Sequence, residues 1–455
     1  MIHPTRVRPL NALPPREGQY VLYWMQASQR AQCNHALEYA IRQAIERGLS
    51  VLVAFGLTPD FPEANARHYA FMLEGLRETQ AALARRGVPL VVRLGSPPEV
   101  ALRLAQEAAL LVTDRGYLRV QRQWRQEVAR RAPCPVVQVE SDVVVPVEVA
   151  SDKEEYAART IRPRVQRHLD TYLTPLQETR PKRRWDGPLP AGLDLSDVDA
   201  VVRQLTVTGE VAPVAHFTGG TSQGLARLEQ FLANYIGRYD TDRNEPKLDA
   251  TSHVSPYLHF GQLSPLQVAL AVGEYEGPGP AAYLEELLVR RELACNFVHH
   301  NPIYDTYEAL PGWARDALAR HAADRREYLY TRQQFEQAAT HDQYWNAAMQ
   351  EMLLTGYMHN YMRMYWGKKI IEWSCTPEEA YATLLYLNNK YFLDGRDPSS
   401  FANVAWCFGK HDRPWQERPV FGTVRYMNAA GLNRKFDMSG YLQRVADLAA
   451  RYGDR

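Results

Sequence analysis

A cluster of oxidisable side chains lies between Trp345 and Trp373. This stretch holds three tryptophans, three tyrosines and five of the ten methionines of the chain. Its densest part, Tyr361 to Trp366, is followed seven residues later by Trp373. On a helix that spacing is two turns along one face, or about 10 Å. It suits electron transfer in short steps and equally suits a packed hydrophobic core, and by itself the pattern favours the core.

A second group of residues could bind phosphate. The loop 251–256 reads TSHVSP and brings three hydroxyl groups together shortly before an expected helix. Hydroxyls and backbone N–H groups near helix starts form anion cradles. A capping turn explains such a loop equally well, since Ser264-Pro265 nearby has the form of an N-cap followed by an N1 proline. The residues leave both interpretations open.

Two charged pairs are candidates for a polar site. Arg363, in the methionine-rich stretch, and Asp394, in the turn LDGRD, are expected to form a buried ion pair, because a buried charge requires a partner. Such a pair could tune a polarised heterocycle, or it could be a structural salt bridge. In the expected helix 281–296, Glu286 is spaced to pair with Arg290 at i, i+4, as on a solvated face. The same carboxylate could instead hydrogen-bond a pyrimidine edge in a pocket.

The first third of the chain alternates apolar runs with amphipathic segments. Strands are expected at 20–24, 51–55, 88–94, 109–113 and 136–139, and helices at 34–47, 65–86 and 98–106. Apolar strands separated by helices indicate a parallel, Rossmann-like sheet covered on both faces. No GxGxxG follows the first strand, so the ordinary dinucleotide fingerprint is absent. The sheet could still bind a ligand at its carboxyl edge.

The chain is long enough for at least two domains. We expect an N-terminal arm at 1–18, an α/β domain at 19–147, a linker at 148–215 and an all-α domain at 216–455. The linker is expected to hold one short helix near 164–174. Helices of the last part are expected at 224–235, 265–274, 281–296, 313–320, 343–358, 361–373, 377–387 and 439–451.

Composition narrows the class of protein. The net charge of +1 gives no global attraction toward nucleic acid. No stretch of about 18 uncharged apolar residues occurs, so a membrane-spanning segment is not expected. Five single cysteines without CxxC pairs argue against disulfides and a metal site, and for a reducing, cytoplasmic compartment (nucleoid-associated if prokaryotic). Residues 159–184 hold eight Arg/Lys against two acids, and 396–440 hold seven against four, mixed with aromatics. These clusters could bind a nucleic-acid strand or be solvated surfaces.

Motifs spread over nearly the whole chain resemble class II cyclobutane pyrimidine dimer DNA photolyases. They are YVLYWMQASQRAQCNHALEYAI (20–41), RYDTDRNEP (238–246), TSHVSPYLHFGQ (251–262), LEELLVRREL (284–293), YMRMYWGKKIIEWS (361–374), YLNNKYFLDGRDP (386–398) and HDRPWQERPVFGTVRYMNAAGLNRKFD (411–437). One departure is the stretch 406–411, which is shortened where the family has a glycine pair before HDRPW. The resemblance implies an α/β domain plus a helical domain that holds folded FAD.

The resemblance also implies roles for single residues. Arg363 and Asp394 would be the ion pair beside the isoalloxazine, and Asn388 the residue near flavin N5. Trp366, Trp345 and Trp373 would relay electrons in that order from flavin to surface, with Tyr330 as an additional redox-active aromatic. The flavin phosphates would be bound by Tyr239, Thr251, Ser252, Val254 and Ser255. The dimer pocket would be lined by Glu286, Met364 and Trp406, with Arg243 and Arg425 on the lesion strand.

The implied activity is light-driven repair of pyrimidine dimers in double-stranded DNA by electron transfer from reduced FAD, in a monomeric enzyme. The electron would pass to a flipped-out dimer, with Glu286 as a hydrogen-bond partner of the radical anion. An antenna chromophore, a deazaflavin or another, is open. A cryptochrome-like photosensor without repair is the alternative, although such a protein would be expected to lose Glu286, Met364 and Trp406. A nucleic-acid-binding module with an inert aromatic core is a further one.

Overall fold

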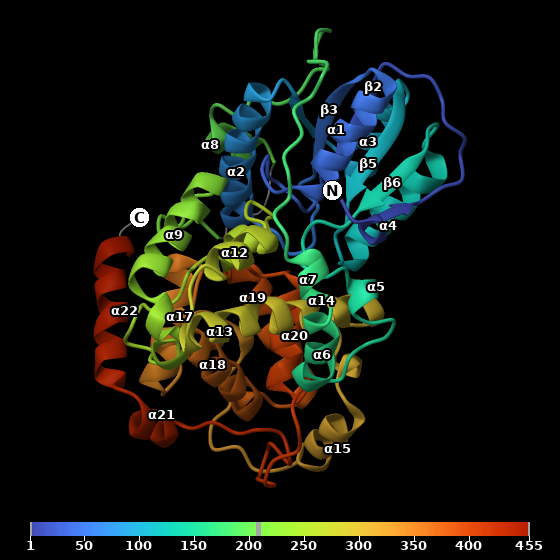
Figure 1. The fold of residues 1–455 in the computed structure, drawn as a ribbon. Coiled ribbons are helices and arrows are strands. Elements are labelled where there is room, and N and C mark those ends of the chain that lie inside the picture. The colour runs from blue at the N-terminus through green and yellow to red at the C-terminus, as the bar shows by residue number, and fades with distance from the viewer. Residues whose placement is uncertain (1, 206–210, 454–455) are drawn as a thin grey trace.

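The protein consists of a sheet domain followed by a helical domain (Figure 1). The computed structural model describes residues 2–205 and 211–453. Its six-stranded sheet has the order β1-β6-β5-β2-β3-β4, and all neighbours are parallel except β1 and β6. The strands are β1 (Val7–Pro9), β2 (Tyr20–Trp24), β3 (Ser50–Leu57), β4 (Leu90–Leu94), β5 (Ala108–Asp114) and β6 (Val136–Val139).

Alternating side chains of the buried strands face two different helix layers. In β2, Val21 and Tyr23 pack in one apolar cluster with α1 (His35–Arg47) and α2 (Ala66–Arg85). Leu22 and Trp24 pack in another with α3 (Pro97–Ala105) and α4 (Arg119–Arg131). The period of two in a strand explains this division. The predicted α/β architecture, covered on both faces, is therefore confirmed.

Two parts of the sheet domain differ from the prediction. The segment 1–18 was expected to be an arm, but residues 7–9 form β1, which adds an antiparallel edge to an otherwise parallel sheet. The pairing with β6 extends one residue beyond β1, since Leu10 N–H donates to Val136 O at 2.8 Å. Helix α4 was not predicted, because its sequence is arginine-rich and only a narrow apolar stripe faces the sheet.

The segment 148–215 holds more structure than the single predicted helix. Its helices are α5 (Val147–Ala150), α6 (Ala158–Gln166), α7 (Leu169–Tyr172) and α8 (Val198–Gln204). The helix expected at 164–174 is in fact two helices, which residues 167 and 168 separate. These helices are too short for a sequence period to be visible. Residues 206–210 of the segment lie outside the described part of the chain.

The helical domain is built around a second apolar core, which contains the tryptophan-rich stretch. The predicted helices are present, with ends that differ by a few residues. The predicted 281–296 is a continuous run of α13 (Pro278–Leu284), a π-helical turn (Glu285–Arg290) and α14 (Arg291–His300). The other longer helices are α9 (Thr221–Asn234), α12 (Pro265–Val272), α15 (Gly312–Arg320), α17 (Gln343–Thr355), α18 (Asn360–Trp373), α19 (Pro377–Tyr391), α20 (Pro398–Cys407), α21 (Ala429–Lys435) and α22 (Met438–Tyr452), of which α20 and α21 were not predicted. Short helices are α10 (Tyr239–Asp242), α11 (Ser255–His259) and α16 (Arg332–Glu336), with 3₁₀ turns at Pro4–Arg6, Ile236–Arg238 and Tyr307–Ala309. No helix among the described residues is both long and apolar enough to cross a membrane.

Arg67 of α2 fastens the sheet domain to the helical domain. Its guanidinium donates to Met352 O at 3.2 Å and Leu353 O at 2.7 Å, in the last turn of α17. It also donates to Tyr391 O, at the end of α19, at 2.8 Å. A cation is favoured where helix carbonyls lack intrahelical partners. The contact therefore fixes the end of α17 and the end of α19, and α19 lines the site described next.

Candidate active site

A cavity of about 1320 Å³ opens between the π-helical turn, α14, α18, α19 and α20. Segments more than a hundred residues apart in the sequence meet at its wall. Six of the residues predicted to have a role in the site line it: Glu286, Arg363, Met364, Trp366, Asn388 and Trp406. The structure thus brings residues from three predicted motifs, together with Trp406, to one hollow.

The predicted ion pair is present at one end of this cavity. Arg363 Nη2 lies 3.0 Å from Asp394 Oδ1 and 3.2 Å from Oδ2, and the side chains are 19% and 14% exposed. The Arg363 guanidinium also lies 3.7 Å from the ring centroid of Phe392. Both charged residues line a smaller adjoining hollow together with Ser255. A polar ligand could therefore extend from the ion pair toward the hydroxyl-rich loop.

Asn388 is held rigidly within the wall of the cavity. It is 5% exposed, and its Nδ2 donates to Ser400 Oγ of α20 and to Asn389 Oδ1 at 2.9 Å. Both N–H groups of the amide are thus hydrogen-bonded within the protein. The carbonyl oxygen of the amide is the atom left for a ligand.

The hydroxyl-rich loop lies beside the cavity, and its hydroxyls bond to tyrosines. Thr251 Oγ1 is 3.0 Å from Tyr357 OH, and Ser252 Oγ is 3.0 Å from Tyr283 OH. Tyr239 packs edge-on against Tyr283, with ring centroids 5.2 Å apart. Burial raises the pKa of Tyr239 to about 12, so its hydroxyl stays protonated at neutral pH. Of the five residues predicted to bind phosphate, only Ser255 lines the adjoining hollow, and Val254 is buried.

The three predicted relay tryptophans form a contiguous chain. Trp366 lines the cavity, and its ring lies 6.3 Å from that of Trp345 in a stacked arrangement. Trp345 lies 6.2 Å from Trp373. The rings therefore follow one another in space in the order Trp366, Trp345 and Trp373.

The expectation that Trp373 ends the chain at the surface is wrong. Trp373 is only 3% exposed, because Tyr330 packs against it at 5.6 Å and His341 at 5.0 Å. Tyr330 is half-buried, and Tyr328, stacked on His341 at 3.6 Å, is 38% exposed. The row of aromatics therefore reaches solvent through the segment 328–341.

Glu286 has a different partner from the one its spacing suggested. Arg243 Nη1 lies 2.7 Å from Glu286 Oε1, whereas Arg290 lies 3.7 Å from Glu285. The π-helical turn explains the correction, because it places residues i and i+5, not i and i+4, above one another. Burial acts to lower the pKa of Arg243, but the hydrogen bond and charge of Glu286 outweigh it and the pKa is raised.

On the opposite side of the cavity, aromatic and basic groups form a stack. The Arg425 guanidinium lies 5.5 Å from the ring centroid of Trp406 and 4.9 Å from that of Trp415. Trp406 is half-buried and Trp415 is 42% exposed. The stack therefore continues from the cavity wall to the outer surface, where a polyanion could contact Arg425.

Comparison with known proteins shows which family the chain belongs to. Residues 21–182 match the model of the DNA photolyase family. The deoxyribodipyrimidine photo-lyase of Methanothermobacter thermautotrophicus is 51% identical over 449 residues, covering 98% of this chain and 99% of that protein. The chain belongs to the DNA photolyase family.

Other photolyases agree in sequence and in fold. The deoxyribodipyrimidine photo-lyase of Potorous tridactylus is 39% identical over 94% of this chain and 82% of its own length. The crystal structure of a class III photolyase from Agrobacterium tumefaciens has a TM-score of 0.72 at 18% identity, covering 95% of this chain and 87% of that one. An archaeal photolyase from Sulfolobus tokodaii, described with two FAD molecules, has a TM-score of 0.70 at 16% identity over 93% and 89% of the two chains. These structures confirm the predicted fold.

The photolyase cavity also contains residues that the sequence analysis missed. They are Arg290, Arg291, Asn360, Ser399, Asn403 and His411. Two of them lie on α20, a helix for which a signal exists: Asp397 Oδ1 accepts from Ser399 N at 2.8 Å, and Pro398 follows the cap. His411, at φ 60°, follows Gly409 at φ 104° in the shortened loop, which the ion pair of Lys410 with Glu154 ties to the linker segment.

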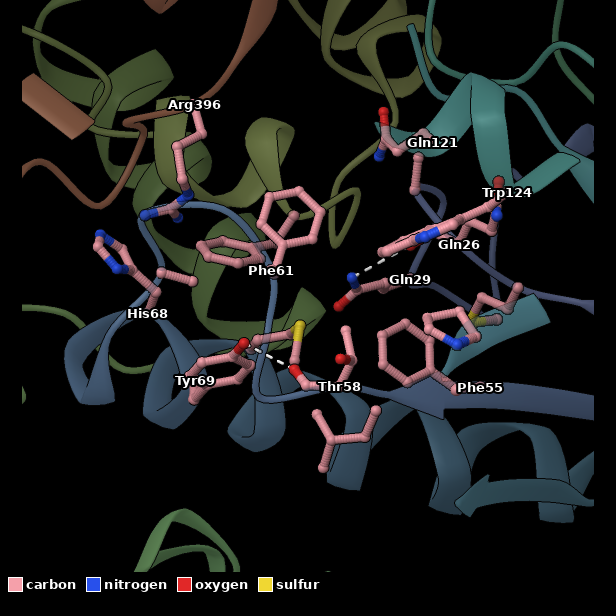
Figure 2. A pocket seen from close by; sticks show the side chains of 18 of the residues that line it. Gln26, Gln29, Phe55, Thr58, Phe61, His68, Tyr69, Gln121, Trp124 and Arg396 are labelled. Carbon is pink, nitrogen blue, oxygen red and sulfur yellow. Dashed lines mark hydrogen bonds between the residues drawn. The ribbon is translucent and has the colours of Figure 1, made fainter. Parts of the chain in front are cut away.

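A second pocket lies in the sheet domain of this photolyase and was not predicted in detail. It encloses about 730 Å³ and is walled mostly by aromatic and apolar side chains, including Phe55, Phe61 and Trp124 (Figure 2). Gln26 Nε2 and Gln29 Oε1 are buried and have no hydrogen-bond partner within residues 2–205 and 211–453. Arg125 donates to Gln26 Oε1 at 3.4 Å, which leaves the Nε2 end for the pocket. The Gln26 N–H donor and the Gln29 oxygen acceptor therefore both lack a partner. Together they suit a ligand that carries a C=O next to an N–H.

Proposed function

We propose that this chain is a class II deoxyribodipyrimidine photo-lyase, which repairs cyclobutane pyrimidine dimers in DNA in a light-dependent reaction. Whole-length similarity to photo-lyases supports the activity. The observation that carries the proposal for the site is the single cavity in which Arg363, Asn388 and Trp366 face Glu286, Met364 and Trp406. The first three residues suit a redox cofactor. The last three suit a pair of flipped-out nucleobases.

The donor set of the cavity and its adjoining hollow fits FAD. The Arg363–Asp394 ion pair would lie beside the isoalloxazine, and the Asn388 carbonyl would face its polar edge. Tyr239, Thr251, Ser252, Val254 and Ser255 would surround the phosphates, with backbone N–H groups at the start of α11 as donors. When bound and reduced, FAD supplies the electron that light delivers to the dimer.

The protein's own groups then position the dimer. A dimer already stacks and pairs poorly, so extruding it from the duplex costs less than extruding intact bases. Met364 and Trp406 would form apolar walls that exclude water from it. Glu286, held by Arg243 at 2.7 Å, would hydrogen-bond the pyrimidine edge. Arg243 and Arg425 would contact phosphates of the lesion strand, which sets affinity without reading sequence.

The row of aromatic side chains would pass electrons to oxidised FAD and so reduce it. Trp366, Trp345 and Trp373 provide ring-to-ring steps of 6.3 and 6.2 Å that start at the cavity. Tyr330, at 5.6 Å from Trp373, would carry the oxidising equivalent onward to the solvent side. We propose that the enzyme acts on double-stranded DNA as a monomer.

The pocket of the sheet domain would hold an antenna chromophore. Its aromatic walls suit a planar ring system. The free Gln26 Nε2 and Gln29 Oε1 would pair with a ring C=O and the N–H next to it. Flavins and deazaflavins both carry such an edge, and we propose a ligand of this kind.

The test is an absorption spectrum of the purified protein, followed by blue light with a thymine-dimer oligonucleotide under reducing conditions. Flavin bands with light-dependent loss of dimer are expected. Flavin without repair would favour the photosensor. A folded protein that binds no added FAD would contradict both and leave the nucleic-acid-binding module. An extra near-ultraviolet or blue band would report the antenna.

A further inference from the structure

A basic pocket lies on the α4 side of the sheet. Its lining residues differ from those of both sites described above, and its Arg125 adjoins the sheet-domain pocket through the hydrogen bond to Gln26. It is formed by β1, α4, β6 and the end of α14, and encloses about 1110 Å³ of open space. Five arginines line it and no carboxylate does, counting residues 2–205 and 211–453. They are Arg8, Arg115, Arg122, Arg125 and Arg130.

The floor of this pocket is a guanidinium without an anionic partner. Arg125 is 5% exposed, and its hydrogen-bond acceptors are neutral: Gln138 Oε1 at 3.0 Å, Gln121 O at 3.2 Å and Gln26 Oε1 at 3.4 Å. Its Nη2 makes no hydrogen bond to the part of the chain that is described. Burial lowers the pKa of Arg125 to about 9, because the charged guanidinium is shielded from water and has no anion bonded to it. A buried charge in that condition favours an anion from outside.

The remaining arginines leave charge available at the rim. Arg115 is neutralised, because Glu140 and Glu148 each lie 3.1 Å from it. Arg8 reaches Glu148 at 3.3 Å but is 63% exposed, and such an exposed pair is weak. Arg122 donates to a carbonyl, His299 O, at 2.9 Å, and Arg130 is exposed. Burial and Arg115 together lower the pKa of His299 to about 3, so this histidine adds no charge at neutral pH.

We infer that this pocket binds a small anion with two or more phosphate groups, of the size of a nucleoside diphosphate. Guanidinium groups bind phosphate oxygens through paired, charge-assisted hydrogen bonds. Five guanidinium groups around one hollow exceed what a single phosphate can pair with, so they suit an anion with more than one phosphate. A DNA backbone would contact the exposed rim but not Arg125 on the floor. The inference does not depend on the proposed repair activity.

The test is isothermal titration of the FAD-loaded full-length protein with inorganic pyrophosphate and, separately, with ADP. Binding of one equivalent with a Kd below about 1 mM is expected for at least one of them. Equal affinity would identify the phosphates as the recognised group, and tighter ADP binding would add a nucleoside contact. Absence of binding by both would overturn the proposal.

Substitutions in the pocket test whether the anion binds there. Arg125→Met should weaken binding at least about tenfold, the loss of one hydrogen bond to a charged group. If that variant does not fold, Arg8→Gln with Arg130→Gln changes only the exposed rim and should also weaken binding about tenfold. Arg77→Gln, an exposed arginine on α2, is the matched control and should bind as the parent does.

Two further results would refute the assignment. One is binding that survives in both pocket variants. The other is displacement of the anion by an undamaged or dimer-containing duplex, which would place it on the DNA-binding face. The rim variant should repair dimers at the parental rate, because neither of its residues lines the large cavity.

Discussion

The ion pair between Arg363 and Asp394 gives the sharpest quantitative prediction. Arg363 Nη2 contacts both carboxylate oxygens at 3.0 and 3.2 Å, and both side chains are more than four-fifths buried. Two unit charges at 4 Å attract by about 4 kcal/mol at an effective dielectric constant of 20. Desolvation offsets part of this, so a net contribution of about 2 kcal/mol is expected, typical of a hydrogen bond between charged groups.

Asp394→Asn, Arg363→Gln and the double variant form a cycle that measures this coupling. Each single variant leaves one partly buried charge without its partner, and we expect each to lower the free energy of unfolding by about 2 to 3 kcal/mol. The double variant leaves no unpaired charge. Its loss in free energy of unfolding should be smaller than the sum of the two single-variant losses, by a coupling energy of about 2 kcal/mol. Urea unfolding followed by tryptophan fluorescence, with FAD-free protein, measures it.

The same variants separate the structural role from the cofactor role. If the pair holds FAD, every variant should retain less FAD per folded molecule, including the double variant whose stability is partly restored. The exposed pair Lys247–Asp437, 41% and 45% exposed at 3.2 Å, serves as control and should show a coupling below about 1 kcal/mol. Additive single effects with full FAD content would refute the reasoning.

Three further predictions address the relay, the dimer pocket and the domain junction. Trp373→Phe should slow photoreduction of oxidised flavin while repair by pre-reduced enzyme survives, as steady-state spectra and a dimer assay would show; equal loss of both contradicts the relay. Glu286→Ala should lower the repair yield at least about tenfold with flavin still bound, and an unchanged yield would move the role elsewhere. Glu292 of α14 accepts hydrogen bonds from Val144 N at 2.6 Å and Val145 N at 3.2 Å, which joins the helical domain to the segment after β6. Burial raises the pKa of Glu292 from 4.5 to about 8, so the folded state binds more protons than the unfolded state between those values. Stability should therefore fall as pH rises through that window, by up to about 1.4 kcal/mol per unit; urea midpoints measure it, and an equal slope in Glu292→Gln would show that another group is responsible.

The strands and long helices could be predicted because their burial is periodic. Strand β6 spans the four residues expected, and α1 ends at Gly48, which has φ 66° and suits the left-handed C-cap. Helix α4 was missed because its apolar positions, Val120, Trp124 and Val128, form only one narrow stripe among polar residues. A stripe of one residue per turn is enough to pack on a sheet but gives little signal in a sequence.

The candidate site was predicted as a set of residues but not as a geometry. Residue identity within motifs indicated Arg363, Asp394 and Trp366, and these meet at one cavity. The partner of Glu286 lies 43 positions earlier in the chain, and no local period encodes such a contact. The photolyase resemblance supplied Arg243 as a neighbour of the lesion, whereas only the folded chain shows it as the partner of that carboxylate.

The π-helical turn at Glu285–Arg290 shows why local spacing misleads at a functional site. On a regular helix Glu286 would pair with Arg290, and both would be a solvated surface pair. The wider turn pairs Glu285 with Arg290 instead and leaves Glu286 on the cavity wall, where Arg243 orients it. A π-turn costs stability relative to an α-turn, so its presence here is explained by what it positions. The deviation from regular geometry is thus what places part of a surface-like sequence on the wall of the large cavity.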